Sequence, residues 1–157
     1  MSQAEDMAAT GKSESVTTVS IQDVSRLSGL SEPTLRYYEK IGLIGPVPRD
    51  ESSGHRRYDG TAVETIEALS CLRAAGMSVR DMRAYLRYLD AAGDNAAEMR
   101  DLFLKNAERV AQEIEQMQTR LRYLQLKADL WDARQRGDIG AEHRAVQALT
   151  NVVADFR

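Results

Sequence analysis

The sequence contains few of the side chains from which most catalytic and metal sites are built. It has one cysteine, Cys71, and two histidines, His55 and His143, among 157 residues. A single cysteine excludes an intrachain disulfide and is typical of a reducing compartment. No Cys/His cluster of metal-ligand spacing can be assembled, and the Walker, GxGxxG and GxSxG motifs are missing. We therefore expect a cytoplasmic protein that is not an enzyme and needs neither a metal nor another cofactor.

Long apolar runs and a large excess of one charge are missing as well. The chain has no apolar stretch of about 18 residues or more, which argues against a membrane span. Residues 1–18 lack the apolar segment of a secretory signal and are polar and free of aromatic residues, so we expect a disordered tail there. The net charge of −3 argues against binding to nucleic acid through bulk charge. Any DNA affinity must come from individually placed contacts and from dimerisation.

Two short helices joined by a tight turn are predicted directly after this N-terminal segment. In "IQDVSRLSG", residues 21–29, apolar residues recur at three-residue spacing and Gly29 is a favourable C-terminal stop. Ser31 is a strong N-cap for a second helix that continues to about Ile41. Two such helices predict a helix-turn-helix.

The segment that follows cannot be helical, because it contains Pro46 and Pro48. Its "DESSG" cluster is typical of a turn between two short runs and predicts a small two-stranded wing. Residues 35–58 carry five basic and three acidic side chains, a local net charge of +2. This charge makes a small basic patch rather than a polybasic arm.

Two further helices are predicted after the wing. The third covers residues 59–75, with Asp59 or Thr61 as its cap, and Gly76 ends it. The fourth begins after Ser78. The two form a second helix–turn–helix junction.

A regular apolar repeat marks the second half of the chain. Its members are spaced alternately by four and three residues, the heptad seam of a coiled coil: Phe103, Ala107, Val110, Ile114, Met117, Leu121, Leu124, Ala128 and Trp131. A helix with this seam spans about 40 Å, more than a domain of this size can cover. We predict a coiled coil between two chains, with a helix folded against its own domain as the alternative. A short final helix is expected from about Ala141.

Residues 19–131 resemble the MerR family of bacterial transcription regulators. The resemblance is carried by "SGLSEPTLRYYEKIGLIGP", "SSGHRRY" and "CLRAAGMSVRDM", followed by a long helix at the expected place. It implies a mainly α fold, a winged helix-turn-helix DNA-binding domain plus a long antiparallel coiled-coil dimerisation helix. We expect a tail at 1–18, the DNA-binding domain at 19–90, the dimerisation helix at 96–134 and a short C-terminal helix at 135–157.

The resemblance also implies a function. A homodimer would bind a palindromic element in double-stranded promoter DNA and distort the spacer in response to an effector or a stress signal, so that RNA polymerase can engage. No contact with a membrane is expected. The alternative is a coiled-coil protein-interaction adaptor that does not bind DNA.

The helix that begins at Ser31 is then the recognition helix, whose N-terminal half we expect in the major groove. Arg36 offers a forked, charged donor set for phosphate or a guanine edge, and Tyr37 offers a hydroxyl for phosphate. The candidate DNA contacts are Thr34, Arg36, Tyr37, Tyr38, Lys40, Arg56, Arg57 and Tyr58, of which Tyr38 is expected mainly to pack between helix and wing. The candidate dimer contacts are Val110, Ile114, Met117, Leu121, Leu124 and Trp131.

Cys71 occupies the position of the lone cysteine in the NmlR/AdhR-like branch of the family, which is linked to aldehyde and electrophile stress. The resemblance therefore implies a thiol sensor for a small electrophile, with the thiolate as the reactive form. The alternative is that Cys71 packs as a small core hydrophobe, because cysteine is among the most buried residue types. Cysteines like those that bind metals in other branches are missing at both ends of the long helix.

Overall fold

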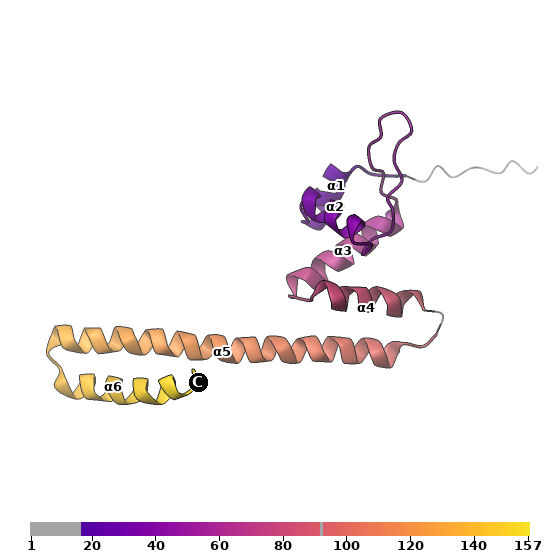
Figure 1. The fold of residues 1–157 in the computed structure, drawn as a ribbon. Coiled ribbons are helices and arrows are strands. Elements are labelled where there is room, and N and C mark those ends of the chain that lie inside the picture. Colours follow the sequence, from indigo (N-terminus) through magenta and orange to yellow (C-terminus); the bar gives the residue numbers. More distant parts are fainter. Residues whose placement is uncertain (1–16, 92) are drawn as a thin grey trace, which may run out of the picture. The chain divides into compact units, whose positions relative to one another are not determined.

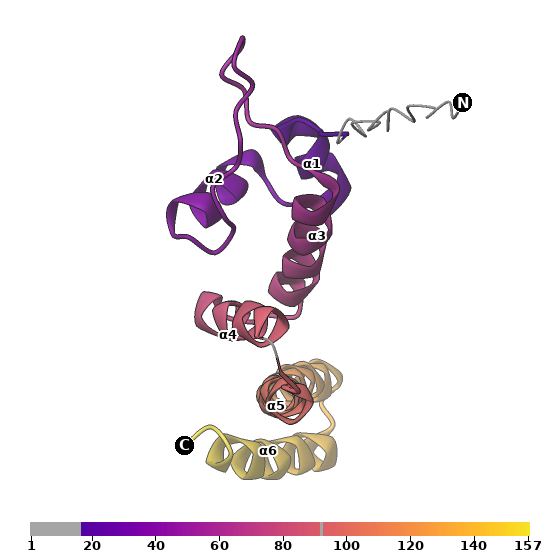
Figure 2. The same cartoon turned by 90° about the vertical axis from the view of Figure 1, so that its right-hand side faces the viewer.

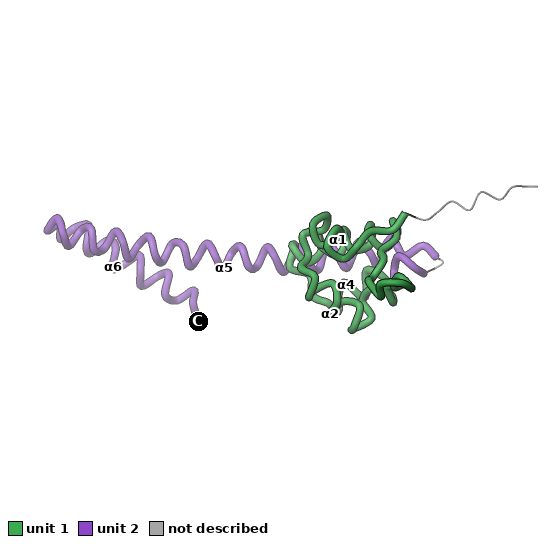
Figure 3. Tube along the Cα trace, turned by 90° about the horizontal axis from the view of Figure 1, so that it is seen from above, with its two compact units in different colours: residues 1–87 green, residues 88–157 purple. Residues whose placement is uncertain are grey.

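The computed structural model describes residues 17–91 and 93–157. Six helices form in this part of the chain (Figure 1): α1 (Ile21–Ser28), α2 (Glu32–Lys40), α3 (Gly60–Ala74), α4 (Val79–Asp90), α5 (Ala96–Arg136) and α6 (Ile139–Ala154). They divide into two compact units, one that ends at Arg87 and one that begins at Tyr88, within α4 (Figure 3). Of the disordered tail expected at 1–18, residues 1–16 lie outside the described residues.

The helix-turn-helix forms as predicted, because its ends are capped by the residues that the sequence supplies. The hydroxyl of Ser20 accepts a hydrogen bond from the N–H of Asp23, and the hydroxyl of Ser31 accepts one from the N–H of Thr34, each at 3.2 Å. Gly29 ends α1 with a φ of 75°, a left-handed conformation that glycine adopts without strain. α1 packs against both α2 and α3.

The first unit has its core between these helices. The most deeply buried side chains come from α1 to α4 and from the chain just before α3: Val24, Leu35, Tyr58, Ile66, Leu69 and Met82. Two long-range hydrogen bonds reinforce it. The hydroxyl of Ser70 on α3 donates to the carbonyl of Ser28, and the guanidinium of Arg83 on α4 donates to the carbonyl of Ile41. These bonds satisfy carbonyls at the C-terminal ends of α1 and α2, which no helical N–H can reach.

The third and fourth helices are capped largely as expected. The carboxylate of Asp59 accepts a hydrogen bond from the N–H of Ala62 at 2.8 Å, which decides between Asp59 and Thr61 as the cap of α3. The hydroxyl of Ser78 accepts one from the N–H of Asp81 at 3.2 Å and so starts α4.

The wing is a narrow hairpin between α2 and α3 (Figures 1 and 2). Its arms are joined by one isolated antiparallel bridge, Arg49 with Arg56. A second bridge, Val19 with Tyr58, joins the end of the wing to the segment before α1. The predicted wing therefore forms as a hairpin, but its two arms are not strands, and no strand forms among the described residues. The physical reason is that the prolines of the outgoing arm have no N–H to donate, which keeps the ladder short.

The second unit is a helical hairpin in which α6 runs back along the C-terminal half of α5 (Figure 1). Gly137 ends α5 with a φ of 68°, and the carboxylate of Asp138 caps α6 by accepting from the N–H of Ala141 at 2.9 Å. The core of the hairpin contains Leu130, Ala145 and Leu149, with Tyr123 and Leu126 packed against it. The long helix thus extends two residues past its expected end at 134, and the short C-terminal helix is α6.

The heptad seam lies on the other side of α5. Because successive residues turn by about 100°, the residues that face α6 (Tyr123, Leu126, Leu130 and Ala133) point away from the seam. Five seam side chains are each more than half exposed: Ile114, Met117, Leu121, Leu124 and Trp131. The chain therefore covers one apolar face of α5 with α6 and leaves the seam open.

Candidate nucleic-acid interface

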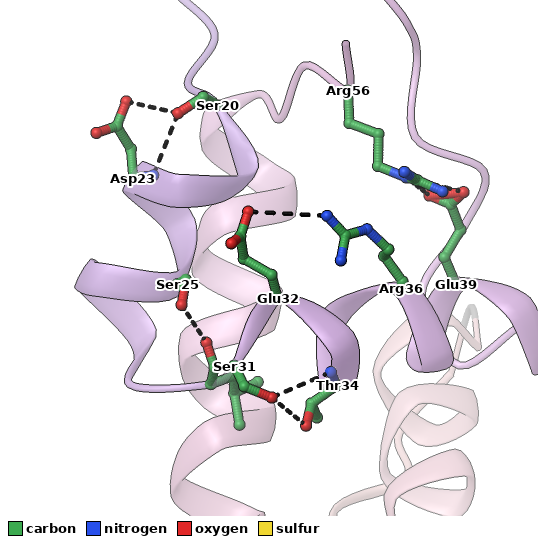
Figure 4. A network of polar contacts seen from close by, with 10 residues as sticks. Ser20, Asp23, Ser25, Ser31, Glu32, Thr34, Arg36, Glu39 and Arg56 are labelled. Atoms are coloured by element: carbon green, nitrogen blue, oxygen red, sulfur yellow. Dashed lines mark hydrogen bonds and ion pairs between the residues drawn. The ribbon is translucent and has the colours of Figure 1, made fainter.

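The first half of the candidate interface is one face of α2. Leu35 and Tyr38 are buried, and helical geometry places Arg36, Tyr37 and Lys40 on the opposite, exposed side. The side chain of Arg36 is 49% exposed and Tyr37 is 52% exposed. The only ion pair of Arg36 in the described chain is a loose one with Glu32, at 3.8 Å (Figure 4). This face therefore presents two cations and a phenol to solvent.

Thr34 lies at the edge of this face. It is half-buried, and its hydroxyl is 2.8 Å from the hydroxyl of Ser31, the cap of the helix (Figure 4). Its side chain is thus held at the N-terminal end of α2.

Two of the candidate DNA contacts are core residues: Tyr38, for which packing is the main expectation, and Tyr58, for which it is not. Tyr38 is 3% exposed and Tyr58 is 1% exposed, so neither ring is available on the surface. Tyr38 follows the exposed Tyr37 by one helical step, which turns it into the core, with the two ring centroids 6.2 Å apart. The hydroxyl of Tyr58 is buried without a hydrogen-bond partner among the described residues. Burial, and then the nearby carboxylate of Glu39, raise the pKa of Tyr58.

The second half of the candidate interface is the wing. The Nε of Arg56 donates to the carboxylate of Glu39 on α2, with distances of 3.2 Å to Oε2 and 3.4 Å to Oε1 (Figure 4). Both side chains are only 19% exposed. Arg56 therefore connects the wing to α2, a contact that the sequence did not indicate. Arg57 is half-buried beside it.

Arg49 and Glu39 are the members of this region that sequence reasoning missed. Arg49 is exposed and lies opposite Arg56 in the hairpin. A signal for this pairing was present: a hairpin centred on "ESSG" places residues 49 and 56 opposite each other. Nothing local indicated the partner of Glu39, because it lies 17 residues away.

The tip of the wing is organised by one carboxylate. Oδ1 of Asp50 accepts hydrogen bonds from the hydroxyl of Ser52 and from the backbone N–H groups of Ser52 and Ser53, at 2.5, 2.9 and 3.0 Å. These bonds, led by the Ser52 hydroxyl, hold the pKa of Asp50 well below its usual value. The turn is therefore built around an ionised side chain.

Cys71 lies on α3 and is exposed. The alternative in which it packs as a core hydrophobe is wrong for this chain.

Other kinds of site are not found in the described part of the chain. Within residues 17–91 and 93–157, no group of three His, Cys, Asp or Glu side chains is arranged to hold a metal ion. None of the helices described is both long enough and apolar enough to cross a bilayer.

Comparisons with known proteins agree with this arrangement. Residues 19–89 match the family described as MerR HTH family regulatory protein. The chain is 42% identical over 82 residues to the HTH-type transcriptional regulator AdhR of Bacillus subtilis (strain 168), covering 52% of this chain and 57% of AdhR. It is 32% identical over 109 residues to the HTH-type transcriptional regulator HmrR of Rhizobium leguminosarum bv. viciae, covering 68% of this chain and 83% of HmrR.

A solved structure extends the likeness to the fold. The crystal structure of HiNmlR, described as a MerR family regulator lacking the sensor domain and bound to promoter DNA, matches with a TM-score of 0.63 and 28% identity. The match covers 80% of this chain and 96% of HiNmlR. The chain has a capped helix-turn-helix and a hairpin wing, and its similarity to HmrR and HiNmlR extends over more than two thirds of its length. This chain therefore belongs to the MerR family of helix-turn-helix regulatory proteins.

Proposed function

We propose that this chain is a transcription regulator that binds a palindromic promoter element as a homodimer. The observation that carries the proposal is the exposed face of α2, on which Arg36, Tyr37 and Lys40 point away from the core. An arginine, a tyrosine and a lysine are typical donors to phosphate and base edges. HiNmlR, a structural relative, was solved bound to promoter DNA.

Dimerisation is the second part of the proposal. The seam of α5 leaves five large apolar side chains more than half exposed, while α6 covers the other face. Each such side chain contributes about 1.5–3 kcal/mol when it is fully buried. An antiparallel coiled coil with a second copy would bury the seam, and its twofold symmetry would match a palindromic site.

The remaining partners follow from this role. A regulator of this family would act at the promoter with RNA polymerase, by distorting the spacer DNA, and hence in the cytoplasm. The proposed signal is a small electrophile that adds to the exposed thiol of Cys71. The support for this last step is the exposure of the thiol and its position on α3, between the wing and α4.

The test is binding of the full-length protein to a labelled duplex from the promoter of its own gene. Arg36→Ala should weaken binding and reduce the slope of log K against log salt by about one, because one phosphate-neutralising charge is lost. Arg120→Ala is the matched control, since it removes the same charge from an exposed position on α5. Absence of binding to any promoter fragment would favour the protein-interaction adaptor instead.

A further inference from the structure

The wing places two like charges directly opposite each other. Arg49 and Arg56 form its single bridge pair. The flanking hydrogen bonds run from the N–H of Asp50 to the carbonyl of His55 and from the N–H of Arg57 to the carbonyl of Pro48, both at 2.8 Å. This pattern defines a non-hydrogen-bonded antiparallel pair, whose side chains leave the same face of the hairpin at close range. Like charges at such positions destabilise a hairpin unless an anion compensates them.

Glu39 compensates only part of this charge. Its carboxylate binds Nε of Arg56 at 3.2 Å and leaves the two terminal nitrogens of that guanidinium outside the hydrogen bond. Arg49 is exposed, and its contact in the hairpin is one long bond from Nη1 to the carbonyl of Gly54, at 3.3 Å. Two guanidinium groups and one carboxylate leave a net charge of +1 on this face.

Two of the other acidic groups nearby, Asp50 and Glu32, are engaged elsewhere. The carboxylate of Asp50 is used by the turn at the tip of the wing. Glu32 pairs loosely with Arg36 at 3.8 Å. Glu51 is an exposed residue of the turn itself. Arg49, the exposed member of the pair, forms no ion pair among the described residues.

We propose that Arg49 and Arg56 together form a binding site for one DNA phosphate and that Glu39 is the positioning residue of this site. Glu39 holds the guanidinium of Arg56 through Nε, which leaves its terminal nitrogens for the anion that Arg49 binds from across the hairpin. The ion pair also joins the wing to α2, so the two DNA-reading elements approach the duplex as one body. The site rests on the proposed DNA-binding function and adds Arg49 and Glu39 to it.

The sign of one substitution tests the role of Glu39. If Glu39 were only a negative charge near DNA, its removal would reduce repulsion and strengthen binding. As a positioning residue it has the opposite effect: Glu39→Gln should weaken binding to the promoter duplex about tenfold and lower the salt slope by about one. Glu32→Gln is the matched control on the same helix, and it should leave binding unchanged or strengthen it.

Two arginine variants test the site without relying on Glu39. Arg49→Ala should lower the salt slope by about one. Arg56→Lys should do the same although it keeps the charge, because a single ammonium group cannot bind Glu39 by one edge and phosphate by another. Thermal unfolding of each DNA-free variant shows whether it is folded. If Glu39→Gln is not folded, the two arginine variants decide the question.

The outcomes are distinct. Weaker binding and a lower slope in folded Glu39→Gln, Arg49→Ala and Arg56→Lys support the site. Suppose that the wild type binds tightly. Equal or tighter binding by Glu39→Gln, or unchanged salt slopes in both arginine variants, then overturns the phosphate site but not the proposed function. A wild-type protein that binds no promoter duplex overturns the proposed function and the site with it.

Discussion

Three consecutive side chains of α2 fall on two different sides of the helix, because each helical step turns by about 100°. Arg36 and Tyr37 are exposed, whereas Tyr38 is buried in the core of the first unit. The helix thus uses the ring of Tyr38 for packing and leaves the ring of Tyr37 available to a partner. The wing shows a similar division, with Arg49 exposed and Tyr58 in the core.

The thiol of Cys71 allows a first prediction at this scale. Because Cys71 is exposed, Cys71→Ser should change the free energy of unfolding by no more than about 0.5 kcal/mol. The variant should bind promoter DNA like the wild type and lose the response of binding to methylglyoxal. Chemical denaturation and fluorescence anisotropy with and without the aldehyde measure both effects. A response that persists in the serine variant would remove Cys71 from sensing.

Asp50 allows a prediction about pH. A carboxyl group whose pKa is lowered by folding stabilises the folded form above its usual value of 3.8, and this contribution is lost as the pH falls below that value. The amide resonances of Ser52 and Ser53 should therefore remain constant down to about pH 4 and shift only in stronger acid. An NMR titration checks this.

Asp50→Ala provides the counterpart to the titration. At every pH the variant should lack the hydrogen bonds from the amides of Ser52 and Ser53 to Asp50, and the two amide resonances should shift accordingly. Glu51→Ala changes the neighbouring exposed carboxylate and should leave both resonances in place. Equal spectra for Asp50→Ala and the wild type would show that the backbone alone holds the turn.

At the scale of elements, α5 is a helix with two apolar faces, of which its own chain covers one. One face packs against α6 through Leu130 and its neighbours, and the other carries the seam. A sequence repeat identifies the seam but does not say which face its own chain will cover. The hairpin shows that α6 covers the face without the heptad repeat.

This arrangement predicts the effect of charges on the seam. Ile114→Glu combined with Leu121→Glu should give monomers in light scattering, because four carboxylates cannot be buried at a symmetric interface. The helical content should stay constant, since α6 packs on the other face. Gln112→Glu combined with Gln116→Glu adds the same charge away from the seam and should remain dimeric. A dimeric seam variant at micromolar concentration would contradict the proposed interface.

At the scale of the whole molecule, the two units are expected to cooperate through the dimer. The core of the first unit contains no seam residue, so the monomeric Ile114→Glu/Leu121→Glu variant should keep a folded helix-turn-helix. It should bind the full palindrome at least about 100-fold more weakly than the wild type, because the two half-sites are no longer bound by one linked pair. The affinities of the variant and the wild type for a single half-site should differ little.

Anisotropy titrations with full-site and half-site duplexes measure this coupling. Equal affinity of the variant and the wild type for the full palindrome would mean that dimerisation is not needed for DNA binding. Weak binding to both duplexes would point to a damaged first unit, which thermal unfolding would reveal.

Much of this molecule follows from its sequence. Helix ends and apolar faces are set by residues a few positions apart, such as the caps at Ser31 and Asp59, the stop at Gly29 and the heptad seam. Local interactions of this kind decide where a helix begins, where it ends and which of its faces is apolar. The position of the wing was predictable for the same reason, since prolines and a turn cluster exclude a helix locally. The exposed face of α2 was predictable too, because the positions of its buried residues along the helix determine which side chains face solvent.

Only the tertiary structure decided the rest, because it depends on contacts between distant residues. The burial of Tyr58, the exposure of Cys71 and the choice of which face of α5 is covered all depend on what packs against each element. The ion pair between Glu39 and Arg56 joins residues 17 positions apart, and the bond from Arg83 to Ile41 joins residues 42 apart. A one-dimensional pattern contains no distance between such residues, so neither contact could be predicted until the chain had folded and brought them together.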